Sequence, residues 1–366
     1  MPKILKNLKF IFIFFIVFLF FLLAGDYFLS NFFFEKKELI ENPHRVQNKF
    51  YHHTLLKNFD GLEKWGSKEY RICTDHLGFK TDCLNVNNSS EFDIAFIGDS
   101  FTEGIGMEYH DTFVGLFANS AKDLKIANLA VSSYSPSISF KKIEHLLSSG
   151  VKFKHLIVFI DISDIQDEAN YYIEDKDNNI TSRDLLDSRK RKLIKFKKTL
   201  RKNFILTYAL YDRIKKVAKK ENVSKEEKVF NLDRSTWTSN NEANGYGLLG
   251  VSGGIKKSLT YMNRLRQLLD DKDISLSIGV YPWPDQLSEM TNNLKNKIRQ
   301  VEIWENFCLA NCKEFFNLFP VFNKYVAEFG YLNTYKNFYI DGDVHFNKKG
   351  NELIYKALQA KINSYR

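Results

Sequence analysis

Five short, nearly continuous apolar runs limit what this chain can fold into more than any other feature of its sequence. They lie at residues 92–98, 124–131, 155–160, 274–281 and 315–319. Segments with the spacing of amphipathic helices separate most of them and follow the last one. Strands that are apolar along their whole length are typical of parallel sheets with helices on both faces. The sequence therefore predicts an α/β fold, a three-layer α/β/α sandwich with a five-stranded parallel sheet.

The N-terminus carries a second strong pattern, an uncharged apolar run over residues 10–25. Lys3, Lys6 and Lys9 precede it, and apolar residues continue beyond the lone Asp26. This favours one transmembrane helix over residues 10–30, with residues 1–9 in the cytoplasm and the remaining chain in the periplasm or at the cell surface. A cleaved signal peptide is the alternative, but no good small-x-small pair precedes Asp26, and the absence of a following cysteine excludes a lipoprotein anchor.

The rest of the chain divides by composition. A polar and irregular N-terminal extension is expected over residues 31–90, and the main domain over residues 91–366. A charged, Asn-rich insertion with a helical middle interrupts this domain at about residues 170–250. Residues 183–234 contain 18 Lys and Arg against 7 Asp and Glu, a charge of +11 in a chain whose total is +9. We favour a solvated basic insertion, with contact to anionic lipid headgroups or an acidic glycan as the alternative.

The basic segment contains no nucleic-acid reader motif, so no nucleic-acid partner is expected. The cysteines support an extracytoplasmic location, because Cys73 with Cys83, and Cys308 with Cys312, are placed for two local disulfides in an oxidising compartment. Four buried free thiols are the alternative. Neither pair has the usual spacing of metal ligands, so no metal site is expected.

A candidate catalytic site begins where the first apolar run ends, at Gly98-Asp99-Ser100. A serine at the carboxyl end of a parallel strand lies where open α/β sheets bind ligands. It needs a base to become a nucleophile, and His345 has the appropriate chemistry. A carboxylate must orient that histidine, and Asp343 and Asp341 lie two and four residues before it.

At these residues the chain resembles the SGNH (GDSL-type) hydrolases. Gly98-Asp99-Ser100-Phe101-Thr102 resembles the first sequence block of the family, and Asp343-Val344-His345 resembles the last. Residues 128–134 and 161–164 resemble the two middle blocks. The resemblance covers about residues 92–362 and implies the flavodoxin-like fold of that family.

The resemblance also implies roles for single residues. Ser100 would be the nucleophile, His345 the base and Asp343 the acid, with Asp341 as the alternative acid. The oxyanion hole would use the backbone N–H groups of Ser100 and Ser133 and the hydroxyl of Ser163. Ser133 replaces a glycine of the family and Ser163 an asparagine. The short Asp-x-His spacing resembles a membrane-associated branch that acts in polysaccharide O-acetylation.

Two further groups of polar and aromatic residues have open interpretations. Tyr281 and Trp283 follow the fourth apolar run, where they are either loop packing or a platform for a sugar ring. Asp164, Asp167 and Glu168 are interpreted as the start of a solvated helix rather than as a metal cluster.

The combined pattern predicts a membrane-anchored extracytoplasmic serine esterase that acts on acyl esters of a glycan or lipid, with no metal or organic cofactor. One alternative is an O-acetyltransferase of surface polysaccharide, working with a multipass acyltransferase partner. Another is a catalytically weak glycan-binding module. A phosphotransfer or dinucleotide enzyme is excluded, because Gly98-Asp99-Ser100 lacks the glycine-rich loop that such ligands need.

Overall fold

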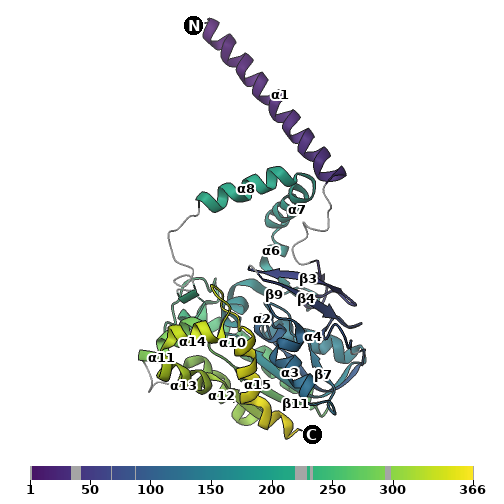
Figure 1. Ribbon diagram of the computed structural model, residues 1–366, viewed down its shortest axis with the longest axis vertical. Helices are drawn as coiled ribbons and strands as arrows, with labels where there is room; N and C mark the ends of the chain where they lie inside the picture. Colours follow the sequence, from purple (N-terminus) through teal and green to yellow (C-terminus); the bar gives the residue numbers. More distant parts are fainter. Residues whose placement is uncertain are drawn as a thin grey trace. The chain divides into compact units, whose positions relative to one another are not determined.

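A computed structural model describes residues 2–33, 43–66, 68–86, 88–218, 229–230, 234–292 and 298–365. The chain divides into two compact units (Figure 1). The first contains Met1–Pro43 and Asp184–Val223, and the second contains His44–Arg183 and Ser224–Arg366. The candidate catalytic residues all belong to the second unit.

The second unit is built on an eight-stranded sheet with the order β12-β11-β8-β6-β7-β5-β4-β3. Its five parallel strands confirm the predicted sheet, and they are β6 (Glu91–Ile97), β7 (Ile126–Asn128), β8 (Lys152–Ile160), β11 (Ser275–Val280) and β12 (Glu314–Asn317). In chain order their arrangement is 2-1-3-4-5, the flavodoxin-like order. The chain adds β7 on one side of β6 and β8 on the other, so a topological switch point lies between β6 and β8.

Helices cover this sheet. The last six residues of β8 and the last five of β11 are all buried, and successive strand residues point to opposite faces, so both faces must be covered. Two helix pairs contribute to the cover, namely α3 (Phe113–Ser120) with α15 (Lys348–Asn363), and α4 (Pro136–Ser148) with α10 (Gly250–Asp270). Helix α12 (Arg299–Asn311) packs on β11.

The N-terminal extension is not irregular as expected. It forms β1 (Arg45–Asn48), β2 (His52–Leu55), β3 (Asp60–Trp65), β4 (Lys68–Thr74) and β5 (Lys80–Thr81). Strands β1 and β2 make a separate two-stranded sheet, whereas β5, β4 and β3 extend the main sheet beyond β7 in antiparallel fashion. The expectation was wrong because these strands are short and partly exposed, so they lack the continuous apolar pattern of the parallel core.

The insertion is divided between the two units. Strands β9 (Tyr172–Glu174) and β10 (Ile180–Ser182) pair in the second unit, where Trp237 is also fully buried. The basic helices α7 (Ser188–Asn203) and α8 (Ile205–Ala218) follow the short α6 (Arg183–Leu186), and α7 and α8 belong to the first unit with α1 (Pro2–Phe32). Residues 219–228 and 231–233 of the insertion lie outside the described part. Within α1, the stretch Phe10–Phe32 is long and apolar enough to cross a membrane.

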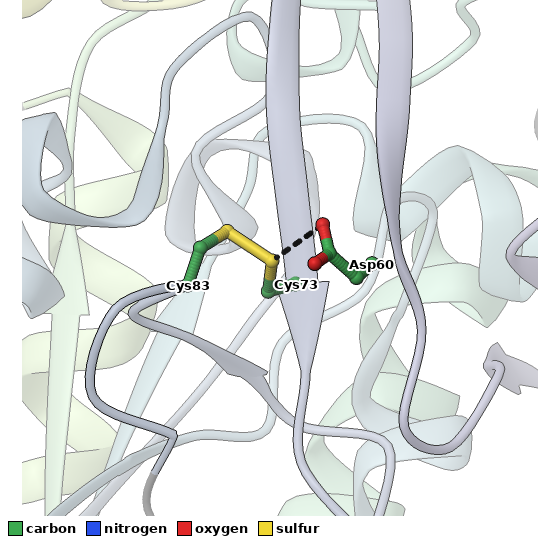
Figure 2. Close-up of side chains that lie close together, drawn as sticks. All are labelled: Asp60, Cys73 and Cys83. Carbon is green, nitrogen blue, oxygen red and sulfur yellow. Dashed lines mark hydrogen bonds between the residues drawn. A yellow bond between two sulfur atoms is a disulfide. The ribbon is translucent and has the colours of Figure 1, made fainter.

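Both cysteine pairs form disulfides, Cys73–Cys83 and Cys308–Cys312. Figure 2 shows Asp60 beside the first of them, with Asp60 Oδ1 at 3.3 Å from Cys73 Sγ. These three side chains are grouped closely enough to suggest a metal site. The thiolate is the form of cysteine that binds metals, and a disulfide contains none, so this cluster is structural.

Candidate active site

Ser100 is the first residue of α2 (Ser100–Glu103), which begins directly after β6 and its two-residue turn. Gly98 is required in this turn, because a Cβ there would lie 2.5 Å from Thr102 Oγ1 and 2.9 Å from the carbonyl oxygen of Phe159. Asp99 caps the helix by accepting a hydrogen bond of 3.0 Å from the N–H of Phe101. The Gly-Asp-Ser sequence thus turns the chain sharply and leaves Ser100 at the carboxyl edge of the sheet.

His345 meets Ser100 from the C-terminal loop. Its Nε2 lies 2.7 Å from Ser100 Oγ. Its Nδ1 is hydrogen-bonded to Asp343 Oδ1, and its backbone N–H donates to the same oxygen at 3.0 Å. Ser100 and His345 are only 8% and 7% exposed, so their hydrogen bond is largely shielded from water. The structure thus brings together the serine, histidine and Asp343 in the order that nucleophilic catalysis needs.

Asp341, the alternative acid, is not in this arrangement. It is exposed, and it accepts no hydrogen bond from a residue that the structure describes. Gly342 follows it with a φ of 70°, and this left-handed turn separates Asp341 from the histidine. Asp343 is therefore the carboxylate positioned to orient His345.

A residue that was not predicted from the sequence also contacts the acid. Trp65, the last residue of β3, donates from Nε1 to Asp343 Oδ2 at 2.9 Å. Its ring also packs edge-to-face against His345, with centroids 5.3 Å apart. Burial alone would raise the pKa of Asp343, but the hydrogen bonds and charge of His345, together with Trp65, lower it below its ordinary value. The acid is thereby kept ionised beside the imidazole.

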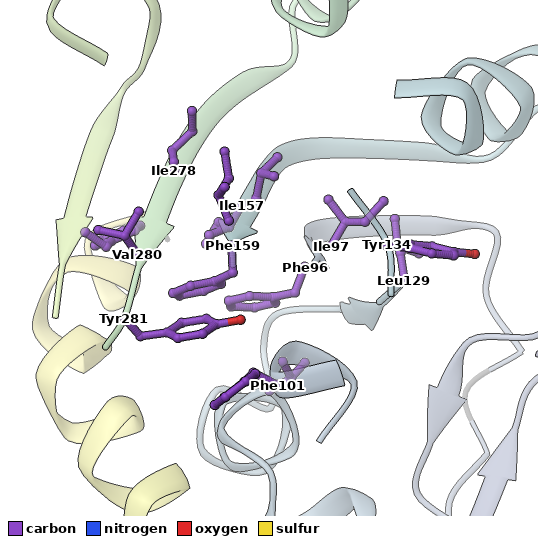
Figure 3. Packing of buried hydrophobic residues seen from close by; sticks show 14 of the residues in the cluster. Phe96, Ile97, Phe101, Leu129, Tyr134, Ile157, Phe159, Ile278, Val280 and Tyr281 are labelled. Atoms are coloured by element: carbon purple, nitrogen blue, oxygen red, sulfur yellow. The ribbon is translucent and has the colours of Figure 1, made fainter. Parts of the chain in front are cut away.

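Asp99 is buried beside Ser100. Figure 3 shows the aromatic rings of Phe101 and Tyr281 that pack next to it. Ser100 Oγ is 3.1 Å from Asp99 Oδ2, and the Tyr281 hydroxyl donates to Asp99 Oδ1 at 2.8 Å. The rings of Phe101 and Tyr281 pack with centroids 4.7 Å apart. Burial and the nearby charge of Asp161 raise the pKa of Asp99 well above its ordinary value, which favours the neutral acid. A neutral Asp99 does not compete with His345 for the serine proton.

The sugar-platform interpretation of Tyr281 and Trp283 is wrong. Their exposed fractions are 0% and 6%, so neither offers a free ring face. Trp283 donates from Nε1 to Asp161 Oδ2 at 2.6 Å, as Tyr281 does to Asp99. Both side chains pack in the interior and donate hydrogen bonds to the buried carboxyl groups behind the site.

Ser133 has the backbone conformation that its position in the turn requires. Its φ is 64°, in the left-handed region where glycine is normally favoured. This agrees with the glycine that the resemblance implies at this position. Its carbonyl oxygen accepts a hydrogen bond from the Tyr172 hydroxyl at 2.7 Å. The preceding Ser132 is held on two sides, by Glu103 Oε2 at 2.6 Å from its N–H and by His53 Nε2 at 2.7 Å from its carbonyl oxygen.

The groups that hold this turn were not predicted. Glu103 is fully buried and is fixed by Arg45 of β1, whose guanidinium lies 2.6 Å and 2.9 Å from the two carboxylate oxygens. Burial lowers the pKa of His53 to about 3, so its ring is neutral and its Nε2–H donates to Ser132. The N-terminal extension thus fixes the backbone that would receive an oxyanion.

Ser163 follows β8, the strand next to β6, and lies at the same edge of the sheet as Ser100. It is buried, and its N–H donates to Asp161 Oδ1 at 2.7 Å. Its hydroxyl makes no hydrogen bond with any residue that the structure describes, so it remains available to a ligand.

Asp164, Asp167 and Glu168 were expected to start a solvated helix. This expectation was wrong, because all three are buried. Glu168 accepts hydrogen bonds from the Ser135 hydroxyl and the Ser137 N–H, at 2.6 Å and 2.7 Å, and forms an ion pair with Lys257. Burial raises the pKa of Asp167 to about 7. These acids hold the loops behind the site in place. Their hydrogen-bond and ion-pair partners come from positions too distant in sequence to predict.

No family model and no curated protein matches the chain. Solved structures that it resembles include a member of the lipolytic protein G-D-S-L family from Veillonella parvula, with a TM-score of 0.41 and 10% identity over 74% of this chain and 98% of that one. The esterase EstA from Pseudoalteromonas sp. has a TM-score of 0.39 and 11% identity, over 76% of this chain and 98% of that one. A mutant of Axe2, an acetylxylan esterase from Geobacillus stearothermophilus, has a TM-score of 0.40 and 11% identity, over 74% of this chain and 94% of that one. At these values the chemistry of the chain must be inferred from its own residues.

Proposed function

We propose that the protein is a membrane-anchored serine esterase that acts outside the cytoplasm on acyl esters of a glycan or lipid. The distance of 2.7 Å between Ser100 Oγ and His345 Nε2, with Asp343 behind the histidine, is the observation that supports this best. A buried serine and histidine with a half-buried carboxylate, in this order, match the requirements of an activated hydroxyl nucleophile.

The reaction would proceed in two halves. Ser100 Oγ attacks the ester carbonyl carbon while His345 Nε2 takes the serine proton, and Asp343 stabilises the resulting imidazolium. The N–H groups of Ser100 and Ser133 and the hydroxyl of Ser163 would receive the oxyanion. His345 then returns the proton to the departing alcohol, which leaves an acyl-serine. A water molecule, deprotonated by His345, releases the acid and regenerates Ser100.

Two observations support anchoring outside the cytoplasm. The apolar helix Phe10–Phe32 follows Lys3, Lys6 and Lys9, and basic residues before a span favour a cytoplasmic N-terminus. The two disulfides fit an oxidising compartment.

An O-acetyltransferase is the second candidate, and the Asp-x-His spacing at Asp343 and His345 favours it. The same acyl-serine would then be resolved by a sugar hydroxyl in place of water, with a multipass acyltransferase as the source of acyl groups. A glycan-binding module is less well supported, because Tyr281 and Trp283 offer no exposed ring face.

The test is covalent labelling of the full chain in detergent with a fluorophosphonate probe. We expect the wild type to be labelled, and Ser100→Ala and His345→Ala to lose labelling while their circular dichroism stays unchanged. Ser364→Ala, a change in an exposed serine at the end of α15, is the matched control and should label normally. A folded wild type that does not react would refute an activated serine.

A second assay separates the two enzymatic candidates. Wild-type protein that has not been exposed to the probe is given an acetyl ester with and without an oligosaccharide acceptor. Release of acetate that the acceptor does not reduce identifies the esterase, and acetylation of the acceptor identifies the transferase.

A further inference from the structure

The first unit holds a polar side chain of α1 against the first turn of α8. Asp26 Oδ2 accepts hydrogen bonds from the N–H and the hydroxyl of Thr207, at 2.8 Å and 2.6 Å. Asp26 Oδ1 accepts from the N–H of Leu206 at 3.1 Å, and Ser30 Oγ accepts from the N–H of Ile205 at 2.9 Å. The first N–H groups of a helix have no partner within the helix, and here α1 supplies them.

This arrangement provides hydrogen-bond partners both for the carboxylate of α1 and for the first N–H groups of α8. Asp26 is 5% exposed and Ser30 is fully buried, so the one carboxylate within the apolar stretch of α1 is covered by α8. A carboxylate is also favourable at the positive end of a helix dipole. The ring of Tyr27 lies against that of Phe204, with centroids 5.7 Å apart, and adds an apolar contact beside the polar one.

The contact fixes the depth of α8 if α1 spans a membrane, so the inference rests on the proposed anchoring. At a rise of 1.5 Å per residue, Asp26 lies about 9 Å before Phe32, the last residue of the apolar stretch. A bilayer core needs about 20 predominantly apolar residues, and the stretch Phe10–Phe32 is 23 residues long. The first turn of α8 therefore lies within about 9 Å of the end of the apolar stretch, near the level where the hydrocarbon gives way to the lipid headgroups.

Helix α8 exposes an apolar stripe that suits this level. Leu206, Leu210 and Ile214 recur every four residues and are 47%, 60% and 60% exposed. Tyr211, beside them, is 50% exposed. Residues four apart lie on one face of a helix, so these side chains form a continuous apolar strip.

Helix α7 adds a similar strip surrounded by positive charge. Leu193 and Phe196 are 51% and 62% exposed. Its exposed cationic side chains form no ion pair with any residue that the structure describes, apart from Lys190 with Asp184, and they include Arg189, Lys192, Lys195, Lys197 and Lys202. Exposed apolar residues flanked by lysines are typical of helices that lie in the surface of an anionic membrane.

We propose that α7 and α8 together form a membrane-surface platform that binds anionic lipid headgroups. The strip of Leu206, Leu210 and Ile214 enters the boundary between headgroups and acyl chains, and the lysines of α7 contact the headgroups. The basic insertion is thus a second membrane contact of the protein, held to the first by Asp26.

The test uses the full chain reconstituted in lipid nanodiscs of phosphatidylcholine, with and without phosphatidylglycerol. A single environment-sensitive fluorophore is attached at Leu210→Cys, because all four native cysteines are in disulfides. Leu248→Cys, a leucine of the second unit that is 95% exposed, is the matched control. Lipids carrying a nitroxide in the headgroup region act as quenchers.

We expect the Leu210 label to have blue-shifted emission and stronger quenching than the Leu248 label, and the difference to grow with phosphatidylglycerol. Replacement of Lys192, Lys195 and Lys197 by Gln should remove the effect of phosphatidylglycerol. The same change at the exposed Lys122, Lys125 and Lys272 should leave it in place.

Emission and quenching at Leu210 equal to those at Leu248 would overturn the proposal and leave a solvated basic insertion. Equal quenching with and without phosphatidylglycerol would overturn the headgroup contact. Co-elution of the protein with the discs is measured separately. Failure to co-elute would refute the membrane anchor and, with it, the platform, whereas co-elution with a water-exposed Leu210 label would refute the platform alone.

Discussion

The indole of Trp65 donates a hydrogen bond of 2.9 Å to the carboxylate of Asp343, although 278 residues separate the two along the chain. This bond uses the carboxylate oxygen that His345 leaves free, so the acid is held from both sides. Trp65 touches the acid and the histidine but not the serine, and we regard it as a positioning residue.

Trp65→Phe should therefore lower kcat and leave KM unchanged. It removes the N–H donor and keeps an aromatic ring beside His345. A hydrogen bond to a charged group contributes about 1.5–3 kcal/mol, which corresponds to a loss of about 10–100-fold. Steady-state hydrolysis of a p-nitrophenyl acetate substrate measures both constants. Trp304→Phe is the control, because that indole N–H has no partner among the described residues, and it should leave kcat as in the wild type.

The two candidate acids can be separated by one isosteric change at each position. Asp343→Asn should reduce kcat by about 10⁴, because an amide cannot hold the imidazole in the required tautomer. Asp341→Asn changes an exposed side chain and should have almost no effect. The comparison uses the same ester assay, with circular dichroism to confirm folding. Equal losses in the two variants would argue against the assignment of Asp343.

Asp99→Asn should keep kcat within about tenfold of the wild type, despite its contact with Ser100. Burial and the charge of Asp161 favour the neutral form of Asp99, and an asparagine reproduces the shape of a neutral acid. Its oxygen can still accept from Tyr281 and from the N–H of Phe101. A loss in kcat as large as that of Asp343→Asn would show that Asp99 acts in its ionised form.

Ser163→Ala should lower kcat by about 10²–10³ if the hydroxyl is an oxyanion donor. Ser163→Asn places an amide donor at the same position and should retain far more activity than the alanine variant. The readout is kcat for the ester, with the fluorophosphonate reaction as a check that Ser100 is still activated. An alanine variant with the kcat of the wild type would remove Ser163 from the oxyanion hole.

Asp167 should make stability depend on pH. Burial raises its pKa from 3.8 to about 7, so the folded state prefers the neutral acid. Its favourable contribution is fully present below pH 3.8 and is lost as the pH rises through about 7. Between pH 5 and pH 8 the free energy of unfolding should therefore fall by about 2–3 kcal/mol more in the wild type than in Asp167→Asn.

Chemical denaturation of the full chain in detergent, followed by circular dichroism, measures this difference. Asp271→Asn changes an exposed carboxylate and should keep the pH dependence of the wild type. If Asp167→Asn also keeps it, the buried acid is not the source.

The parallel core of the fold could be predicted because its strands are buried on both faces. Burial on both faces produces continuous apolar runs such as residues 155–160. Such a strand can be predicted without knowing which residues pack against it. Ser100 and His345 could be proposed as catalytic residues because each lies in a pattern visible within a few residues. For Ser100 this is the end of an apolar strand, and for His345 it is the Asp-x-His motif. The left-handed φ of Ser133 agrees with the glycine that the resemblance implies at this position.

Most of the support around the site could not be predicted. Trp65, Arg45 and His53 come from short, half-buried strands whose polar residues resemble a loop in the sequence. The burial of Asp167 and Glu168 depends on partners such as Arg234 and Lys257, which the fold brings from distant positions. Tyr281 and Trp283 illustrate the reverse error, since an aromatic pair after a strand resembles a binding surface until its burial is known.

Strands β3, β4 and β5 also set the boundary of any fragment that is expressed without α1. A protein beginning at residue 91 would retain Ser100, His345 and Asp343. It would lack the hydrogen-bond donor to Asp343 and the two groups from β1 and β2 that hold the turn at Ser132 and Ser133. It would also expose the edge of β7, and unpaired strand edges promote aggregation. If such a fragment were inactive or insoluble, the cause would be the missing strands, and the result would not test the role of Ser100.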